Sequence, residues 1–113
     1  MDNKRQLGSF MEERAALYLE DRGVKILERN YRFHRNEIDI IGFDGEYYIF
    51  TEVKYRSDEK TGLPEEAVDY KKQTIIRKVA LQYLVSHNLN EYTPVRFDVV
   101  AIDKEIRWHK NAF

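Results

Sequence analysis

The sequence contains no cysteine, and its 113 residues include only 2 prolines and 5 glycines. The absence of cysteine excludes disulfide scaffolds, thiolate zinc sites, iron–sulfur clusters and cysteine nucleophiles, and it fits a reducing cytoplasm best. Few prolines and glycines, together with 42% apolar and 35% charged residues, exclude a disordered or collagen-like chain. A globular chain of this length is expected to form one domain, residues 1–113.

Long apolar runs and an excess of one charge are also missing. No stretch approaches the roughly 18 apolar residues that span a bilayer, and the polar N-terminal segment lacks a signal-peptide core. We therefore expect a protein that is neither secreted nor inserted in a membrane. Because 19 basic and 20 acidic residues give a formal net charge of -1, binding to nucleic acid requires a local basic patch.

Hydrophobic periodicity and turn residues divide the chain into two helices and four or five strands. Ser9 and Glu12 have capping-box spacing, so the first helix is predicted to begin at Ser9 and to end before Gly23. Strands are predicted over residues 24–33, 38–43, 47–55, 95–102 and 105–109, and a second helix over residues 65–87. The order αβββαβ, with the short last strand, predicts an α/β (or α+β) fold with a mixed central sheet and flanking helices.

The dipeptide Asp44-Gly45 predicts a tight hairpin between two of these strands. Both central positions of a type I′ turn need positive φ, which aspartate and glycine tolerate. A two-residue turn places Phe43 opposite Glu46. Counting back from this pair predicts the register of the whole hairpin.

In this register, three carboxylates and one ammonium group share one face of the hairpin. Glu37 is predicted to face Glu52, and Lys54 follows two residues later on the same face. Asp39 is predicted to face Phe50 and to lie diagonal to Glu52. Two carboxylates about 5 Å apart repel by roughly 3 kcal/mol at an effective dielectric near 20. The cluster favours a hard divalent cation with oxygen ligands, and a solvated hairpin face is the alternative.

The order of Asp39, Glu52 and Lys54 also resembles the D…ExK pattern of restriction-endonuclease-like nucleases. The surrounding segments, from Gly8 to the C-terminus, resemble the YraN-like family, a bacterial group of predicted nucleases related to archaeal Holliday-junction resolvases. The similarity is carried by Asn30-Tyr31-Arg32, residues 50–56, residues 64–68, Lys72-Gln73, residues 96–100 and Asn111-Ala112-Phe113. Met11 and Asn36 stand where the family pattern has glycine, and Asn36 is expected to keep a left-handed or bulged conformation.

The resemblance implies a restriction-endonuclease-like core and a metal-dependent endonuclease that hydrolyses DNA, with branched or junction DNA preferred. By resemblance, Asp39 and Glu52 would hold Mg²⁺ or Mn²⁺ together with the backbone carbonyl of Val53. Lys54 would orient the attacking water or stabilise charge that develops on the phosphate. The related resolvases act as symmetric dimers, so a homodimer is expected.

Three other charged residues are candidates for accessory roles. Glu12 either completes the site from the first helix or is the capping-box partner of Ser9. Glu37 either supports the metal ligands or is a solvated edge residue. Lys72 ends the apolar stripe of the second helix, so it either snorkels to solvent or reaches the carboxylates and contacts a phosphate. We favour the functional role for Lys72.

Candidate nucleic-acid contacts come from basic residues near aromatic ones. Those predicted to bind DNA are Arg32, Arg35, Arg56, Lys71 and Lys72. Such a charge run can also be an ordinary solvated face. Two other functions therefore stay open: a nucleic-acid-binding module of the same fold with little catalysis, and a structural protein. Arg96 and Asp98 flank Phe97 in a buried strand and are expected to pair structurally.

Overall fold

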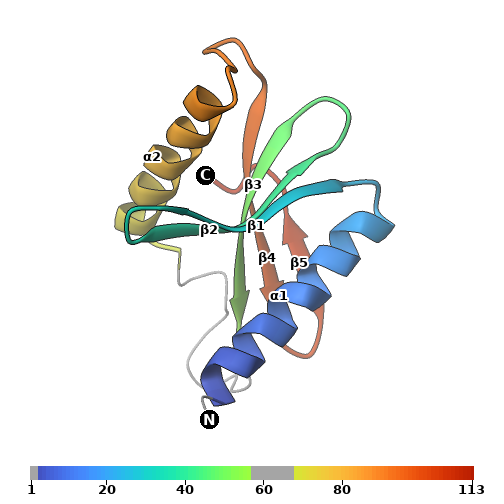
Figure 1. The fold of residues 1–113 in the computed structure, drawn as a ribbon. Helices are drawn as coiled ribbons and strands as arrows, with labels where there is room; N and C mark the ends of the chain where they lie inside the picture. Colours follow the sequence, from blue (N-terminus) through green and yellow to red (C-terminus); the bar gives the residue numbers. More distant parts are fainter. Residues whose placement is uncertain (1–2, 57–67) are drawn as a thin grey trace.

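The computed structural model describes residues 3–56 and 68–113, in which a five-stranded sheet lies between two helices (Figure 1). Its elements are α1 (Asn3–Asp21), β1 (Lys25–Phe33), β2 (Asn36–Phe43), β3 (Tyr48–Tyr55), α2 (Tyr70–Ser86), β4 (Val95–Ile102) and β5 (Ile106–His109). The strand order is β1-β2-β3-β4-β5, with β3 and β4 parallel and all other neighbours antiparallel. The predicted mixed sheet with flanking helices is confirmed.

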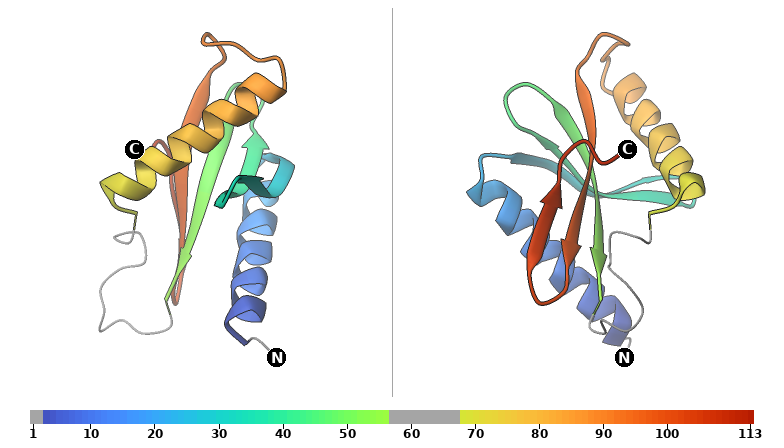
Figure 2. Two further views of the ribbon diagram at one scale, coloured as in Figure 1. Left: turned by 60° about the vertical axis from the view of Figure 1, so that its left-hand side comes forward. Right: turned by 180° about the vertical axis from the view of Figure 1, so that it is seen from behind.

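Each helix covers one side of the sheet, which produces two apolar cores (Figure 2). The core on the α1 side contains Ala15, Ala16, Leu19, Val24, Ile40, Ile49, Val53, Val100 and Ile102. The core on the α2 side contains Ile38, Ile41, Phe50, Ile76, Val79, Ala80 and Tyr83. Neither helix in the described part of the chain is long and apolar enough to cross a membrane.

Both helices begin at places that differ from the prediction. The first starts at Asn3, so Ser9 and Glu12 lie inside it and do not form a capping box. No proline precedes Ser9 to stop the helix, and the turns before it continue in helical geometry. The second starts at Tyr70 because Asp69 caps it, accepting a hydrogen bond from the Lys72 N–H. The predicted helical residues 65–67 and the loop at 62–64 lie outside the described residues.

The predicted two-residue turn between β2 and β3 is wrong. Phe43 pairs with Tyr48 and not with Glu46, so the loop has four residues. The Asp44 carboxylate builds this loop by accepting hydrogen bonds from the backbone N–H groups of Glu46 and Tyr47, at 2.9 and 2.7 Å. Within the paired part of the hairpin, residues 40–43 and 48–51, the resulting shift of two residues leaves side chains on their predicted faces, because strand side chains alternate with period two.

The corrected register changes the partner of Asp39. The β2–β3 ladder ends at the pair Ile40–Thr51, which puts Asp39 level with Glu52 and not with Phe50. The predicted pairing of Glu37 with Glu52 is likewise wrong, because the corrected register puts Glu52 level with Asp39. On its other side, β2 places Glu37 opposite Arg32 of β1. The two carboxyl groups of the D…ExK pattern are therefore direct neighbours.

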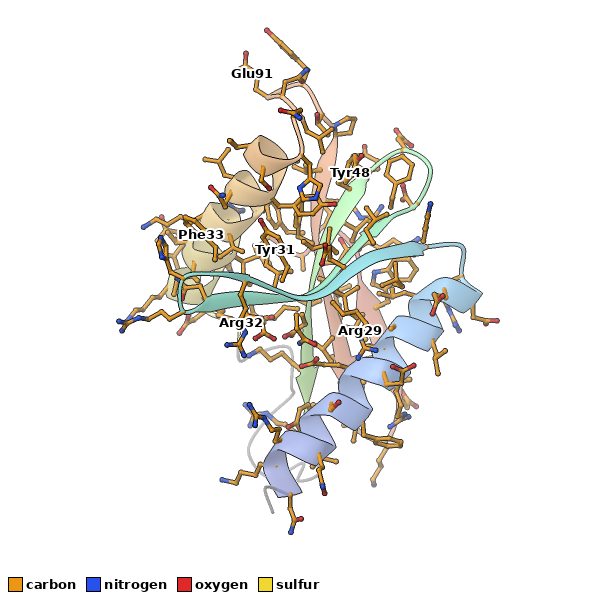
Figure 3. All side chains as sticks on the ribbon, viewed as in Figure 1. Arg29, Tyr31, Arg32, Phe33, Tyr48 and Glu91 are labelled. Carbon is orange, nitrogen blue, oxygen red and sulfur yellow. The ribbon has the colours of Figure 1, made fainter. Side chains whose placement is uncertain are left out.

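The β1–β2 ribbon turns over at the level of Asp39. Arg29 contacts Glu13 of α1, whereas Tyr31, two residues later, packs against Tyr83 of α2 (Figure 3). In a regular strand, residues two apart share a face, so the reversal must occur at Asn30. Asn30 has a left-handed backbone with φ of 54°.

The same reversal occurs in the facing strand β2. Ile38 belongs to the core on the α2 side and Ile40 to the core on the α1 side, so β2 turns over at Asp39. Asn36, which was expected to be left-handed, does not have positive φ; His34, with φ of 58°, takes that conformation in the β1–β2 turn. The side chains of β2 thus switch from one side of the sheet to the other beside the carboxyl groups. Side chains from both helices reach this place, Glu12 from α1 and Lys72 from α2.

Candidate active site

The centre of the site is a contact between Asp39 and Glu52 where the backbones of β2 and β3 separate. Beyond the pair Ile40–Thr51, the Val53 N–H donates to the Asp39 carboxylate at 2.8 Å instead of to the β2 backbone. The Asp39 carboxyl is also hydrogen-bonded to that of Glu52, which is only 3% exposed. A carboxyl pair therefore occupies a gap that a regular sheet would close with backbone hydrogen bonds.

The surroundings of Asp39 disfavour its charged form. Burial raises the pKa of Asp39 most, and the hydrogen bond and negative charge of Glu52 raise it further. The Val53 N–H lowers this pKa, and the charge of Glu12 raises it. Together these effects raise the pKa of Asp39 from 3.8 to about 9. The raised pKa favours a proton on the Asp39 carboxyl, at its contact with Glu52. A bound cation would take the place of that proton.

Lys72 supplies a positive charge to the same pair. Its ammonium group lies 3.1 Å from the Glu52 carboxylate, on the side of the sheet that α2 covers. The side chain is 36% exposed, so it reaches the carboxyl pair and also touches solvent. Lys54 follows Glu52 by two residues in β3 and is partly buried. Lys72 thus pairs with the buried Glu52 carboxylate, and Lys54 lies two residues farther along β3.

Two more carboxylates reach Asp39 from the side of α1. Glu12 and Glu37 both accept hydrogen bonds from the Asn30 side-chain amide, at 2.7 and 2.6 Å. Arg32 contacts the other oxygen of Glu37 at 3.1 Å. Glu12 therefore faces the site and is not a helix cap.

The donor set fits a hard divalent cation. Carboxylate oxygens of Glu12, Glu37 and Asp39 lie within 4.8 Å of one another, and Glu52 adjoins Asp39. The N–H and C=O of a strand residue point to the same neighbouring strand, so the Val53 carbonyl, like its N–H, is directed toward the gap. Mg²⁺ and Mn²⁺ prefer oxygen ligands of this kind.

A cavity of about 500 Å³ opens beside these carboxylates, between α1 and the β1–β2 ribbon. It is lined by Arg5, Gly8, Ser9, Glu12, Asn30, Arg32 and Glu37. Sequence reasoning missed Arg5, Ser9 and Asn30 as site residues. Asn30 could have been found, since it begins the segment Asn30-Tyr31-Arg32 and asparagine tolerates the left-handed conformation. Arg5 carried no signal, because the helix was expected to begin after it.

The predicted DNA contacts are spread over several elements. Arg32 is exposed and paired with Glu37, and Arg35 is exposed in the β1–β2 turn. Arg56 follows β3 and donates its backbone N–H to the Ile102 carbonyl. Lys71 is exposed in the first turn of α2, next to Lys72. Among these residues, Lys72 forms an ion pair with Glu52 of the carboxyl pair.

Arg96 and Asp98 form a structural network, as the sequence predicted. Asp98 is fully buried and accepts hydrogen bonds from Arg96, from the Trp108 indole at 2.8 Å and from the Asn111 backbone. Arg96 also reaches Asp44 at 3.2 Å. These contacts join β4, β5, the C-terminal segment and the β2–β3 loop. Their role is to hold the sheet in shape.

The fold and the site together define an α+β protein with a mixed sheet and one helix on each side. Its carboxyl groups gather where β2 and β3 separate. The chain belongs to the uncharacterised protein family UPF0102, whose model matches residues 11–102.

Proteins of this family from several organisms are similar to this chain. A UPF0102 protein of Lachnoclostridium phytofermentans is 48% identical over 112 residues, covering 98% of this chain and 95% of the relative. One from Clostridioides difficile is 46% identical and covers 98% and 99%. One from Thermodesulfovibrio yellowstonii is 49% identical and covers 96% of both chains. The similarity therefore extends over nearly the whole length of each protein.

Proposed function

We propose that this protein is a metal-dependent endonuclease of the restriction-endonuclease-like class that hydrolyses phosphodiester bonds in DNA. The observation that carries the proposal is the contact between Asp39 and Glu52 in the gap between β2 and β3, with Lys54 following on the same strand. The ladder between β2 and β3 stops where the two carboxyl groups meet, and the Val53 N–H bonds to a side chain instead. This arrangement lowers stability, and a function would explain why it is kept.

Each residue of the site has a proposed role. Asp39, Glu52 and the Val53 carbonyl would hold Mg²⁺ or Mn²⁺, and Glu12 and Glu37 would add negative charge from the α1 side. A divalent cation in this position polarises the phosphate and lowers the pKa of a bound water. Lys54 would orient the attacking water or stabilise charge on the phosphate oxygens.

The proposed substrate is branched DNA, bound through Arg32, Arg35, Arg56, Lys71 and Lys72. The support for this is the resemblance to Holliday-junction resolvases together with basic residues on separate elements around the site. Resolvases cut two strands symmetrically, so the proposal includes a homodimer. A contact between Lys72 and a phosphate is part of this proposal, in addition to its observed ion pair with Glu52.

The proposal is tested by incubating the protein with linear duplex, single-stranded and four-way-junction DNA, in Mn²⁺ and in chelator. Cleavage is expected only with Mn²⁺ and most rapidly on the junction. Asp39→Ala, Glu52→Ala and Lys54→Ala are each expected to lower the cleavage rate by at least about 100-fold, because each removes a group from the reacting centre.

The matched control is Glu91→Ala, since Glu91 is an exposed carboxylate in the loop before β4, far from the cluster (Figure 3). It is expected to cleave like the wild type, and all four variants should keep native circular dichroism. Wild-type protein that binds Mn²⁺ but cuts none of the three DNAs would contradict the proposed activity. A fully active variant at position 39, 52 or 54 would remove that residue from the mechanism.

A second candidate function is a nucleic-acid-binding module with little catalysis. The observation that favours it is the Lys72 ammonium group 3.1 Å from Glu52, because a built-in cation already compensates this carboxylate. On this reading, junction DNA is bound equally well in chelator and in Mn²⁺. Binding that is independent of metal, combined with no cleavage, would favour this function over the nuclease. Protein that binds neither DNA nor metal would point to a structural role.

A further inference from the structure

The side chain of Asn30 links three elements at the edge of the carboxyl cluster. From β1 its amide donates one hydrogen bond to Glu12 of α1, at 2.7 Å, and one to Glu37 of β2, at 2.6 Å. Both amide hydrogens are thereby used. The two glutamates approach each other and Asp39 closely, with ligand atoms within 4.8 Å. Asn30 therefore holds together two groups that repel each other.

An amide differs from a cationic side chain in its effect on the charge of the two glutamates. A lysine or arginine at this position would cancel the charge of the glutamates and would compete with a metal ion. The neutral amide orients both carboxylates and leaves their negative charge intact. Arg32, which pairs with the outer oxygen of Glu37, is 68% exposed and lies farther out.

The backbone of Asn30 makes this double contact possible. Register pairs on both sides, Arg29 with Ile40 and Tyr31 with Ile38, place Asn30 level with Asp39. The ribbon turns over at Asn30, which has φ of 54°, and its side chain reaches both Glu12 of α1 and Glu37 of β2. Asparagine is one of the few residues that adopt this conformation readily and also carry a hydrogen-bond donor.

We infer that Asn30 is a positioning residue, which acts through Glu12 to hold a carboxylate in reach of a cation bound at Asp39. This inference rests on the proposed function, because it assigns Asn30 a role in metal binding at the same site. Groups that orient metal ligands typically contribute a factor of about 10–100 in metal affinity or activity.

Asn30→Gly tests the inference, because glycine accepts the left-handed backbone and removes the side chain together with its amide. The matched control is Asn88→Gly, at another left-handed asparagine, exposed beyond the end of α2. Mn²⁺ binding is measured by the loss of the free-ion electron paramagnetic resonance signal, and DNA cleavage is followed against Mn²⁺ concentration. Asn30→Gly is expected to weaken Mn²⁺ binding by about tenfold or more. Its cleavage should recover at high Mn²⁺, and Asn88→Gly should match the wild type.

A double-mutant cycle with Glu12→Gln separates positioning from a general structural effect. If Asn30 acts through Glu12, then Asn30→Gly in the Glu12→Gln background is expected to weaken Mn²⁺ binding by less than about twofold further. Full additivity in the cycle would overturn the inference, as would unchanged Mn²⁺ binding in Asn30→Gly. Loss of native circular dichroism in Asn30→Gly alone would also overturn it. Wild-type protein that binds no Mn²⁺ overturns the proposed function as well, so the two failures are distinguishable.

Discussion

At the residue scale, the decisive group is the Asp39 carboxyl. Its pKa is raised mainly by burial and next by Glu52, so the folded protein holds a proton there that the unfolded chain releases above its ordinary pKa of 3.8. The folded state therefore binds more protons between these two pKa values, and the free energy of unfolding falls as pH rises through this window.

Asp39→Asn should remove this dependence in the metal-free protein. Asparagine resembles the protonated carboxyl: its oxygen can accept from the Val53 N–H and its amide can donate to Glu52. We expect the variant to be more stable than the wild type in chelator. The gain should grow by about 1–3 kcal/mol between roughly pH 5 and pH 8, on a scale of ~1.4 kcal/mol per pKa unit. Urea unfolding of both proteins across this range supplies the measurement.

Mn²⁺ should stabilise the wild type more than the variant and so reduce the difference in stability between the two proteins. At about tenfold above its dissociation constant it is expected to stabilise the wild type by roughly 1.4 kcal/mol and the variant much less. If Asp39 were only a solvated surface residue, the variant would differ by less than about 0.5 kcal/mol and Mn²⁺ would change neither protein. That result would refute the metal site at Asp39.

At the scale of elements, the β2–β3 loop sets the register on which the site depends. Asp44 lies at its start, and its carboxylate accepts from two backbone N–H groups and from Arg96. These bonds, led by the one from Tyr47, lower the pKa of Asp44. The stability they contribute is thus present above pH 3.8 and lost as pH falls through the folded pKa.

Asp44→Ala is expected to destabilise the protein by about 1–2 kcal/mol, because two backbone N–H groups of the loop lose their acceptor. Asp44→Asn is the matched variant: its side-chain oxygen still accepts both bonds, and only the ion pair with Arg96 is lost. It should be destabilised by less. Thermal melts near neutral pH compare the three proteins. Equal destabilisation of both variants would mean that the ion pair, and not the loop hydrogen bonds, matters.

At the scale of the whole molecule, charge is balanced overall but unevenly placed. The formal net charge is -1, yet α2 carries Lys71, Lys72, Arg77 and Lys78 and no acidic residue. Arg77 lies over the rings of Phe97 and Phe113, and Lys72 is held by Glu52. Lys71 and Lys78 remain exposed. With so little overall charge, binding to DNA must depend on a few local phosphate contacts.

Junction DNA should therefore bind better than a linear duplex of equal length, because a small, nearly neutral domain gains little from a long phosphate track. Arg35→Ala, which removes an exposed cation of the β1–β2 turn, should make the salt dependence of binding shallower by about one unit. Competition titrations at several salt concentrations in chelator measure both effects, with Lys104→Ala, between β4 and β5, as the control. Equal affinity for both DNAs would contradict the junction preference.

Much of the fold was predictable because it depends on local periodicity. The strand Val95–Ile102 has the predicted bounds, and the apolar stripe of α2 packs on the sheet as its spacing indicates. The acidic pattern itself was also visible, since Asp39, Glu52 and Lys54 keep their relative faces even though the hairpin register was two residues off. Alternation and helical spacing are properties of neighbouring residues, and the sequence carries them directly.

Only the tertiary structure decided how the site is assembled. The four-residue loop depends on hydrogen bonds of the Asp44 side chain, and the turnover of β1 and β2 depends on Asn30 and on two helices that cover opposite faces. Neither leaves a periodic signal in the sequence. The sequence by itself determined which elements and carboxylates exist. Packing across the sheet decided that Asn30 joins Glu12 to Glu37, because those contacts link residues far apart in the chain.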